Sequence, residues 1–263
     1  MICASLFFVY RNQLPENVGF SLYSVTHLLF LTGIIIFIIA ITLIYKRSDE
    51  KRQNFFRITI ASTIVLMEVV KDLVAIIIKA LSWEFLPLHL CGLSIFMIAI
   101  HAMKPNKFTA EFLYCLSIPG AVMALIFSDW VIYPVWNIFC LQSFLIHMLE
   151  LTFPIMLLAS GQIRPNPKKL WMPSLFLMIY TPIIFHLNHL LSTNFLFINE
   201  AAPDSPLSFL QNVLGNPGYV FGTIGILVIV WIIMYMPVVL WQRYGNKNFD
   251  SPNKKDNICN TNN

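Results

Sequence analysis

The amino-acid sequence predicts an all-α protein, a polytopic transmembrane bundle of seven helices with its N-terminus outside and its C-terminus in the cytoplasm. Composition is the first reason. Of the 263 residues, 57% are hydrophobic and only 11% are charged, whereas a soluble globular chain carries about 25% charged residues. The second reason is that the apolar residues form runs of roughly 20, the length a helix needs to cross a bilayer. Helix is expected for these runs because lipid offers no partner for unpaired backbone groups.

Seven segments have this length and composition. We expect them to span the membrane at residues 22–45, 58–80, 85–103, 108–127, 133–160, 170–191 and 219–241. Together they predict one transmembrane domain, 22–241, between an exterior N-terminal segment, 1–21, and a polar cytoplasmic tail, 242–263. The fourth segment departs most from the pattern, because it contains Glu111 and a Pro119-Gly120 break.

The basic residues indicate the orientation. Most of the 17 lie in the tail and in the connections after the first, third and fifth segments, which the positive-inside rule places in the cytoplasm. The longest exterior connection, 192–218, is rich in apolar side chains, and we expect it to fold over the bundle as a cap. Because the net charge of +4 sits in short connections, it does not indicate a nucleic-acid partner. The sequence therefore predicts a multi-pass protein of the cell membrane whose partners are membrane lipids.

Charged side chains inside the second and fifth segments are costly in lipid and indicate candidate sites. Glu68, Lys71 and Asp72 are spaced by three and four, which places them on one helix face as a network that can neutralise itself. In the fifth segment Glu150 follows His147 by three residues, and a carboxylate near an imidazole orients a base. Each set also has a structural interpretation, as an ion pair that locks the bundle or as a histidine bonded to a neighbouring helix.

A cysteine and several histidines lie toward the predicted exterior end. His89 and Cys91 open the third segment, and His27, His186 and His189 lie near the outer ends of others. A helix N-terminus lowers the pKa of a thiol and favours a nucleophile, although most buried cysteines are packing residues. Because no nucleotide-binding or zincin motif accompanies these histidines, the sequence predicts neither a metal nor a cofactor.

Several segments resemble the YwaF-like family of bacterial integral membrane proteins. The resemblance is carried by Ser24-Val-Thr-His27, Glu68, Leu86-Pro-Leu-His-Leu-Cys91, Ser143-Phe-Leu-Ile-His147 and Thr193-Asn194-Phe195. That family is distantly similar to the eukaryotic transmembrane protein 164 acyltransferases, which move fatty acyl chains between phospholipids. The resemblance implies that Cys91 accepts the acyl chain and that His147 is the base. It also implies that His27, His89 and Asn194 position the substrate or stabilise an oxyanion.

The sequence leaves three functions open. A membrane-embedded lipid acyltransferase or lipid hydrolase would use the cysteine and the histidine base. A transporter, or a component that translocates ions or protons, would use the buried charges of the second and fifth segments as a relay. A non-catalytic receptor or assembly factor also fits a seven-helix topology, because unrelated folds share it.

Overall fold

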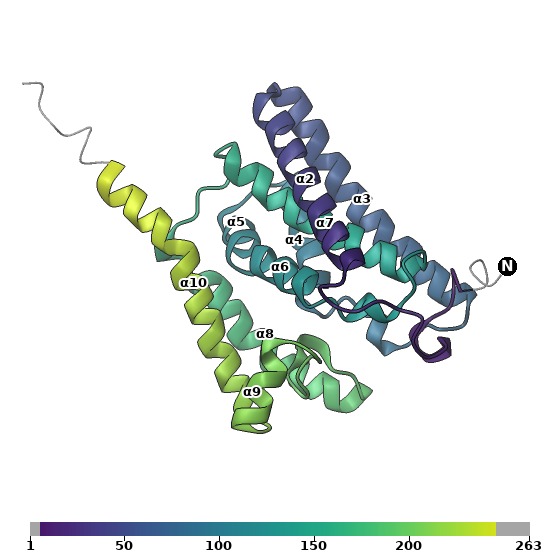
Figure 1. The fold of residues 1–263 in the computed structure, drawn as a ribbon. Helices are drawn as coiled ribbons and strands as arrows, with labels where there is room; N and C mark the ends of the chain where they lie inside the picture. The colour runs from purple at the N-terminus through teal and green to yellow at the C-terminus, as the bar shows by residue number, and fades with distance from the viewer. Residues whose placement is uncertain (1–5, 246–263) are drawn as a thin grey trace, which may run out of the picture.

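The structure, a computed structural model, describes residues 6–245. Every regular element in this part of the chain is helical (Figure 1). Six segments are long and apolar enough to cross a membrane: Val25–Arg47, Trp83–Met103, Lys107–Ile132, Ile138–Ala159, Pro167–Leu191 and Gly218–Leu240. The predictions of an all-α transmembrane fold and of a multi-pass membrane protein are therefore confirmed.

Long helices make up most of the molecule, and shorter elements connect them. The long ones are α2 (Val25–Arg47), α3 (Glu50–Ile77), α4 (Leu90–Met103), α7 (Ile138–Ala159), α8 (Trp171–Leu191) and α10 (Gly218–Gly245). The fourth predicted segment is α5 (Lys107–Phe112), a π-helical turn η3 (Leu113–Ser117) and α6 (Ile118–Ile126), and a further helix is α9 (Pro206–Leu214). The remaining 3-10 turns are η1 (Arg11–Gln13), η2 (Trp83–Phe85), η4 (Asp129–Ile132), η5 (Pro167–Lys169) and η6 (Phe195–Phe197).

The second predicted span, 58–80, corresponds to α3 but is not among the six apolar segments. Its interior contains Glu68, Lys71 and Asp72, which lower its hydropathy. At 28 residues, α3 is about 42 Å long, since a helix rises 1.5 Å per residue. Helix α3 is therefore long enough to span the membrane but less apolar than the other spans. The number of seven spans and the orientation of the protein in the membrane stay predictions.

Side chains at the helix starts define where several helices begin. Ser24, Asp49, Asn106 and Asn137 each accept a hydrogen bond from a backbone N–H of the helix that follows, α2, α3, α5 and α7. Each bond satisfies one of the N–H groups that lack an intrahelical acceptor. The Asn137 amide also donates to the Leu6 carbonyl oxygen, 2.8 Å away, and so attaches the N-terminal segment to the start of α7.

Pro119 explains the irregular fourth segment. It has no N–H, so the Cys115 carbonyl four residues earlier has no donor within its own helix. The chain passes through the π turn η3 at this point. Trp231 of α10 donates its Nε1–H to the Cys115 carbonyl oxygen at 2.8 Å. The proline thereby creates an acceptor that joins the fourth segment to α10.

The carboxyl group that interrupts the same segment has partners on both oxygens. Glu111 is buried, its Oε2 accepts from the Tyr235 hydroxyl at 2.6 Å and its Oε1 accepts from the Asn166 N–H at 2.8 Å. A buried polar group that makes its hydrogen bonds avoids most of the cost of leaving water. Glu111 therefore joins α5 to α10 and to the connection that precedes α8.

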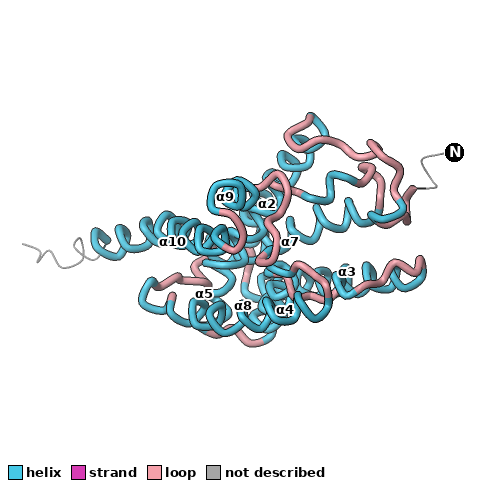
Figure 2. Tube along the Cα trace, turned by 90° about the horizontal axis from the view of Figure 1, so that it is seen from below, coloured by secondary structure: helices cyan, strands magenta, loops and turns pink. Residues whose placement is uncertain are grey.

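Helix α7 is the centre of the bundle. It packs against α2, α3, α4 and α6, and 61% of its span is buried, against 11% for the spans of α8 and α10. Figure 1 shows α2 and α3 side by side on one flank and α8 and α10 on the other. From below, α10 and α3 extend in opposite directions from the centre (Figure 2). A site held by α7 is therefore held by the most enclosed helix.

The outer faces of α2, α8 and α10 are apolar. Large side chains on them are well exposed, among them Val25, Met178 and Phe221. Exposed apolar surface of this extent along transmembrane helices is the surface that lipid covers. The protein therefore contacts membrane lipids along these faces.

The connections predicted to lie outside gather at one end of the bundle. Residues of η1, η2, η4 and the loop around η6 line a single cavity there. The loop 192–218 folds back because buried Asn188 accepts from the Phe195 N–H at 2.8 Å and donates to the Phe195 carbonyl at 3.0 Å. The predicted tail, 242–263, lies outside the described residues except where α10 continues to Gly245.

Candidate functional site

A cavity of about 720 Å³ opens at this end of the bundle. Its walls come from α3, α7, the turns η1, η2 and η4, and the loop after α8. Its polar lining includes Arg11, Lys71, Glu84, His89, Asp129, Gln142, Ser143, Asn194 and Glu200. The same cavity is therefore lined by three of the site residues predicted from the sequence, Lys71, His89 and Asn194.

His147 lies one helical turn beyond the cavity floor, on the central helix α7. Its Nδ1 lies 2.7 Å from the carbonyl oxygen of Ser143, a residue that lines the cavity. The imidazole is almost fully buried, and the indole of Trp130 stacks on it with ring centroids 4.8 Å apart and planes 19° apart. One nitrogen and one face of this histidine are therefore fixed by the protein.

Cys91 is the second residue of α4, two positions after His89, which directly precedes the helix. Its side chain is half-buried. Lys71, Glu68 and Glu150 are near enough to act electrostatically on the thiol. This places Cys91 among the charged groups that α3 and α7 contribute, at the positively polarised end of a helix.

Helices α4 and α7 belong to one apolar cluster. Ile95 and Ile98 of α4 and Ile146 and Leu149 of α7 are buried in it together. Cys91 lies one turn before Ile95, and His147 follows Ile146 directly. The shared packing therefore brings the predicted nucleophile and the predicted base onto neighbouring helices near the cavity.

The charged residues of α3 pair with one another as predicted for one helix face. Lys71 Nζ lies 2.5 Å from Glu68 Oε1 and 3.4 Å from Asp72 Oδ1. It also lies 5.4 Å from the centroid of the Phe85 ring, within cation–π range. Lys71 therefore pairs with its neighbours on α3 and also lines the cavity.

Glu150 has no such partner. It is 1% exposed, and its Oε1 makes no hydrogen bond with any residue that the structure describes. It lies one turn beyond His147 on α7, deeper in the bundle. Glu150 is therefore a buried carboxyl group one helical turn from the candidate base, and its Oε1 accepts no hydrogen bond from the described residues.

The loop after α8 packs over His89. The Leu196 N–H donates to His89 Nδ1 at 3.3 Å, and the imidazole contacts the rings of Phe195 and Phe197. Asn194 holds the same loop together, because its Nδ2 donates to the Glu200 carbonyl at 2.8 Å. Both residues lie at the cavity, and both also have contacts that shape the loop.

His27 lies apart from the cavity lining. It is fully buried, its Nδ1 accepts from the Tyr23 N–H at 3.0 Å, and its Nε2 donates to the Leu125 carbonyl at 3.0 Å. These two bonds use both ring nitrogens and join the start of α2 to the end of α6. The predicted role of His27 with the substrate stays a prediction, and its contacts here are with the chain itself.

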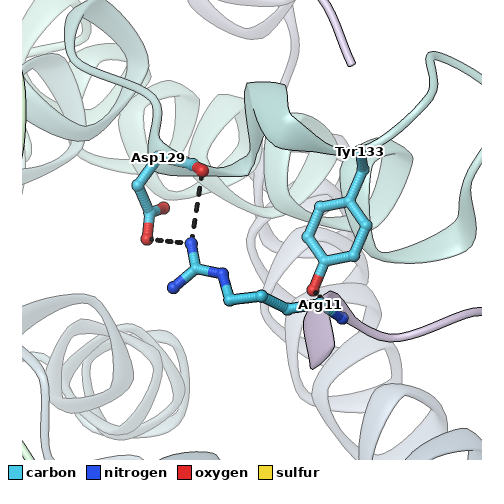
Figure 3. Close-up of polar contacts among 3 residues, drawn as sticks. All are labelled: Arg11, Asp129 and Tyr133. Atoms are coloured by element: carbon cyan, nitrogen blue, oxygen red, sulfur yellow. Dashed lines mark hydrogen bonds and ion pairs between the residues drawn. The ribbon is translucent and has the colours of Figure 1, made fainter. Parts of the chain in front are cut away.

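Three further residues at the cavity were not predicted. Arg11 Nη2 lies 2.9 Å from Asp129 Oδ2, and the Arg11 backbone N–H donates to the Tyr133 hydroxyl at 3.3 Å (Figure 3). Burial lowers the pKa of Arg11, but the Asp129 carboxylate more than compensates and raises it. Burial also raises the pKa of Tyr133. The one sequence signal was that Arg11 is a lone basic residue in a segment predicted to lie outside.

The clasp formed by Arg11, Asp129 and Tyr133 holds η4 against the N-terminal segment, and η4 contains Trp130, the indole above His147. Within residues 6–245, no three His, Cys, Asp or Glu side chains are arranged to hold a metal ion. The candidate site combines a thiol at a helix start, a buried imidazole with one fixed nitrogen, and a polar cavity whose lining includes Trp130.

The family whose model matches the chain is the TMEM164 family, over residues 22–235. This match runs from just before α2 into α10 and includes every residue of the site except Arg11. No curated protein and no solved structure matches the chain. The predicted resemblance to transmembrane protein 164 is confirmed, and the narrower YwaF-like assignment is compatible with it. The chain belongs to the TMEM164 family.

Proposed function

We propose that the protein is a membrane-embedded lipid acyltransferase in which Cys91 accepts the acyl chain and His147 is the base. The hydrogen bond between His147 Nδ1 and the Ser143 carbonyl supports this most directly. A carbonyl oxygen only accepts, so Nδ1 carries the proton, and in the neutral ring Nε2 then keeps a lone pair. A nitrogen with a lone pair is what a general base for the Cys91 thiol requires.

In the proposed reaction the Cys91 Sγ attacks the carbonyl carbon of a lipid ester. His147 Nε2 takes the thiol proton, a C–S bond forms, and the ester C–O bond breaks. The proton then passes to the leaving oxygen and releases a lysolipid. A hydroxyl group of a second lipid attacks the thioester, gives its proton to His147 and restores the thiol. If water takes the place of that hydroxyl group, the same residues hydrolyse the lipid.

The helix start is the feature of Cys91 that supports a role as nucleophile. Backbone N–H groups at a helix start stabilise an adjacent thiolate, and the thiol lies in the first turn of α4. The cavity supplies room for a polar headgroup, while the exposed apolar helices keep acyl chains close by.

The test is acylation of the purified protein in nanodiscs that contain a phospholipid with a fluorescent acyl chain. We expect a hydroxylamine-sensitive label on wild type, none on Cys91→Ala, and labelling at least about 100-fold slower on His147→Ala. Cys140→Ala removes a different thiol of the bundle, one that is fully buried, and should label normally. An unlabelled wild type, or a labelled Cys91→Ala, would overturn the proposal.

We also propose that α3 crosses the membrane, which brings the number of spans to seven, and that the cavity opens on the exterior side. The pairing of the α3 charges with one another supports its presence in the membrane, because paired charges cost less in lipid than single ones. Glu84→Cys and Lys168→Cys lie at opposite ends of the bundle, and both native side chains are exposed. In intact cells an impermeant maleimide should label the first and not the second, and the reverse pattern would refute the orientation.

A proton or ion relay is the second candidate function. The unpartnered Oε1 of Glu150 favours it, because a buried carboxyl group without a fixed partner can exchange a proton. In proteoliposomes with an internal pH dye, the relay predicts proton flux that Glu150→Gln abolishes. Flux that Glu150→Gln leaves unchanged would refute the relay. A receptor or assembly role stays a prediction from the topology.

A further inference from the structure

Trp130 encloses the candidate base from the cavity side. Its ring stacks on His147, with centroids 4.8 Å apart, and meets Phe144 edge to face at 5.4 Å. The residue lines the cavity but is only 8% exposed. Its indole is therefore held between two side chains of α7 at the wall of the cavity.

The Nε1 atom of Trp130 is buried and has no hydrogen-bond partner among the described residues. An indole N–H only donates, so the missing partner is an acceptor. The buried indole N–H of Trp231, in contrast, has a partner, because it donates to the Cys115 carbonyl oxygen at 2.8 Å. A buried donor left unpaired needs an explanation, and a catalytic role or a bound molecule that accepts its hydrogen bond is one.

Two of the three side chains predicted to position the substrate or stabilise an oxyanion use a donor within the chain. The Nε2–H of His27 bonds to the Leu125 carbonyl, and the Nδ2 of Asn194 donates to the Glu200 carbonyl. The tetrahedral intermediate of the proposed reaction nevertheless develops a negative oxygen that needs a donor fixed in advance. The unpaired indole N–H belongs to the ring that stacks on the candidate base and lines the cavity.

We propose that Trp130 is a catalytic residue whose Nε1–H donates to the carbonyl oxygen of the lipid ester and stabilises the oxyanion. This inference rests on the proposed function. When the Cys91 Sγ adds to the carbonyl carbon, the electron pair of the C=O bond moves to oxygen and the indole bond strengthens. When the ester C–O bond breaks, the carbonyl re-forms and the acyl chain remains on sulfur.

Trp130→Phe tests this directly, because phenylalanine keeps an aromatic ring on His147 and removes the N–H. Trp231→Phe is the matched control, since it removes an indole N–H that the protein itself pairs. Two rates are measured in nanodiscs for each variant. One is acylation of Cys91 by the fluorescent phospholipid, and the other is alkylation of Cys91 by iodoacetamide, which forms no oxyanion.

We expect Trp130→Phe to slow acylation by about 100-fold or more and to leave alkylation within about twofold of wild type. Trp231→Phe should retain the wild-type acylation rate. Wild-type acylation in Trp130→Phe would overturn this inference alone. An equal loss of both rates would also overturn it, because Trp130 would then only hold the base in place. A wild type that is never acylated would overturn the proposed function itself.

A second measurement uses the unchanged protein. A trifluoromethyl ketone with a lipid tail adds to a thiol and leaves a stable oxygen anion on the former carbonyl. The indole N–H resonance of Trp130 should shift downfield when this compound occupies Cys91. An unshifted resonance with Cys91 fully occupied would overturn the inference.

Discussion

Replacing Gly92 by alanine should loosen the start of α4, because the preceding turn approaches this glycine closely. A Cβ atom at Gly92 would lie 2.6 Å from the Cα, carbonyl carbon and carbonyl oxygen of Pro87. Favourable contacts between such atoms need about 3.5–4.0 Å. The atoms it meets are backbone, so no side-chain rotation relieves the overlap. The turn that holds His89 must therefore move away from the helix that holds Cys91.

The cost follows from the size of the overlap. Forcing an extra carbon into a close-packed site destabilises a protein by about 1–3 kcal/mol. For a chain of this length, each kcal/mol lowers the melting temperature by roughly 2–4 °C. Gly33→Ala is the control, because nothing lies within 4 Å of its added Cβ. Alanine in the interior of α2 is expected to gain up to about 1 kcal/mol.

The assay is thermal unfolding in detergent, followed by helical circular dichroism, together with the rate at which iodoacetamide labels Cys91. We expect Gly92→Ala to melt at a lower temperature than wild type and Gly33→Ala at an equal or higher one. The labelling rate should change in Gly92→Ala alone. If the two variants melted at the same temperature and labelled at the same rate, the close contact between the turn and α4 would not exist in solution.

Three further predictions concern the contacts that hold the bundle. Tyr235→Phe should destabilise the protein by about 1–3 kcal/mol, because it leaves a buried oxygen of Glu111 without its donor. A thermal-melt cycle with Glu111→Gln should show coupling above about 0.5 kcal/mol, and additive effects would refute the bond. Asn188→Ala should speed proteolysis of the 192–218 loop, measured by mass spectrometry, because the loop loses the side chain that holds it; unchanged cleavage would contradict this. Arg11→Gln should cost at most about 1 kcal/mol, since Arg11 and Asp129 are 44% and 43% exposed, and a larger loss in melts at high salt than at low salt would contradict a screened ion pair.

Much of the fold follows from local sequence. The absence of hydrogen-bond partners in lipid allows only helix for long apolar runs, so six predicted spans correspond to apolar helical segments. The break at Pro119 was also predictable, because proline cannot donate to a carbonyl four residues earlier. The residue that uses that carbonyl, Trp231, was not, since it lies 116 positions away and no local rule selects it.

In the candidate site, too, contacts within one helix follow from the sequence and contacts between distant segments do not. Spacing along one helix predicts that Lys71 meets Glu68, because residues three apart share a face, and the structure has this pair at 2.5 Å. Spacing does not reveal how a polar side chain bonds to distant parts of the chain. His27 and Asn194 are candidates by residue type, yet both have hydrogen bonds within the protein.

Trp130 is the opposite case. In the sequence, Trp130 is an aromatic residue in a short connection between two predicted spans. Aromatic residues are common at the membrane interface, so its position gives no reason to assign it a catalytic role. Only the three-dimensional arrangement shows that its N–H is buried without a partner, while its ring lies on His147. A functional donor is recognised by what the fold leaves unpaired. That property depends on every neighbour at once, which is why the sequence offers Cys91 and His147 as candidates but not Trp130.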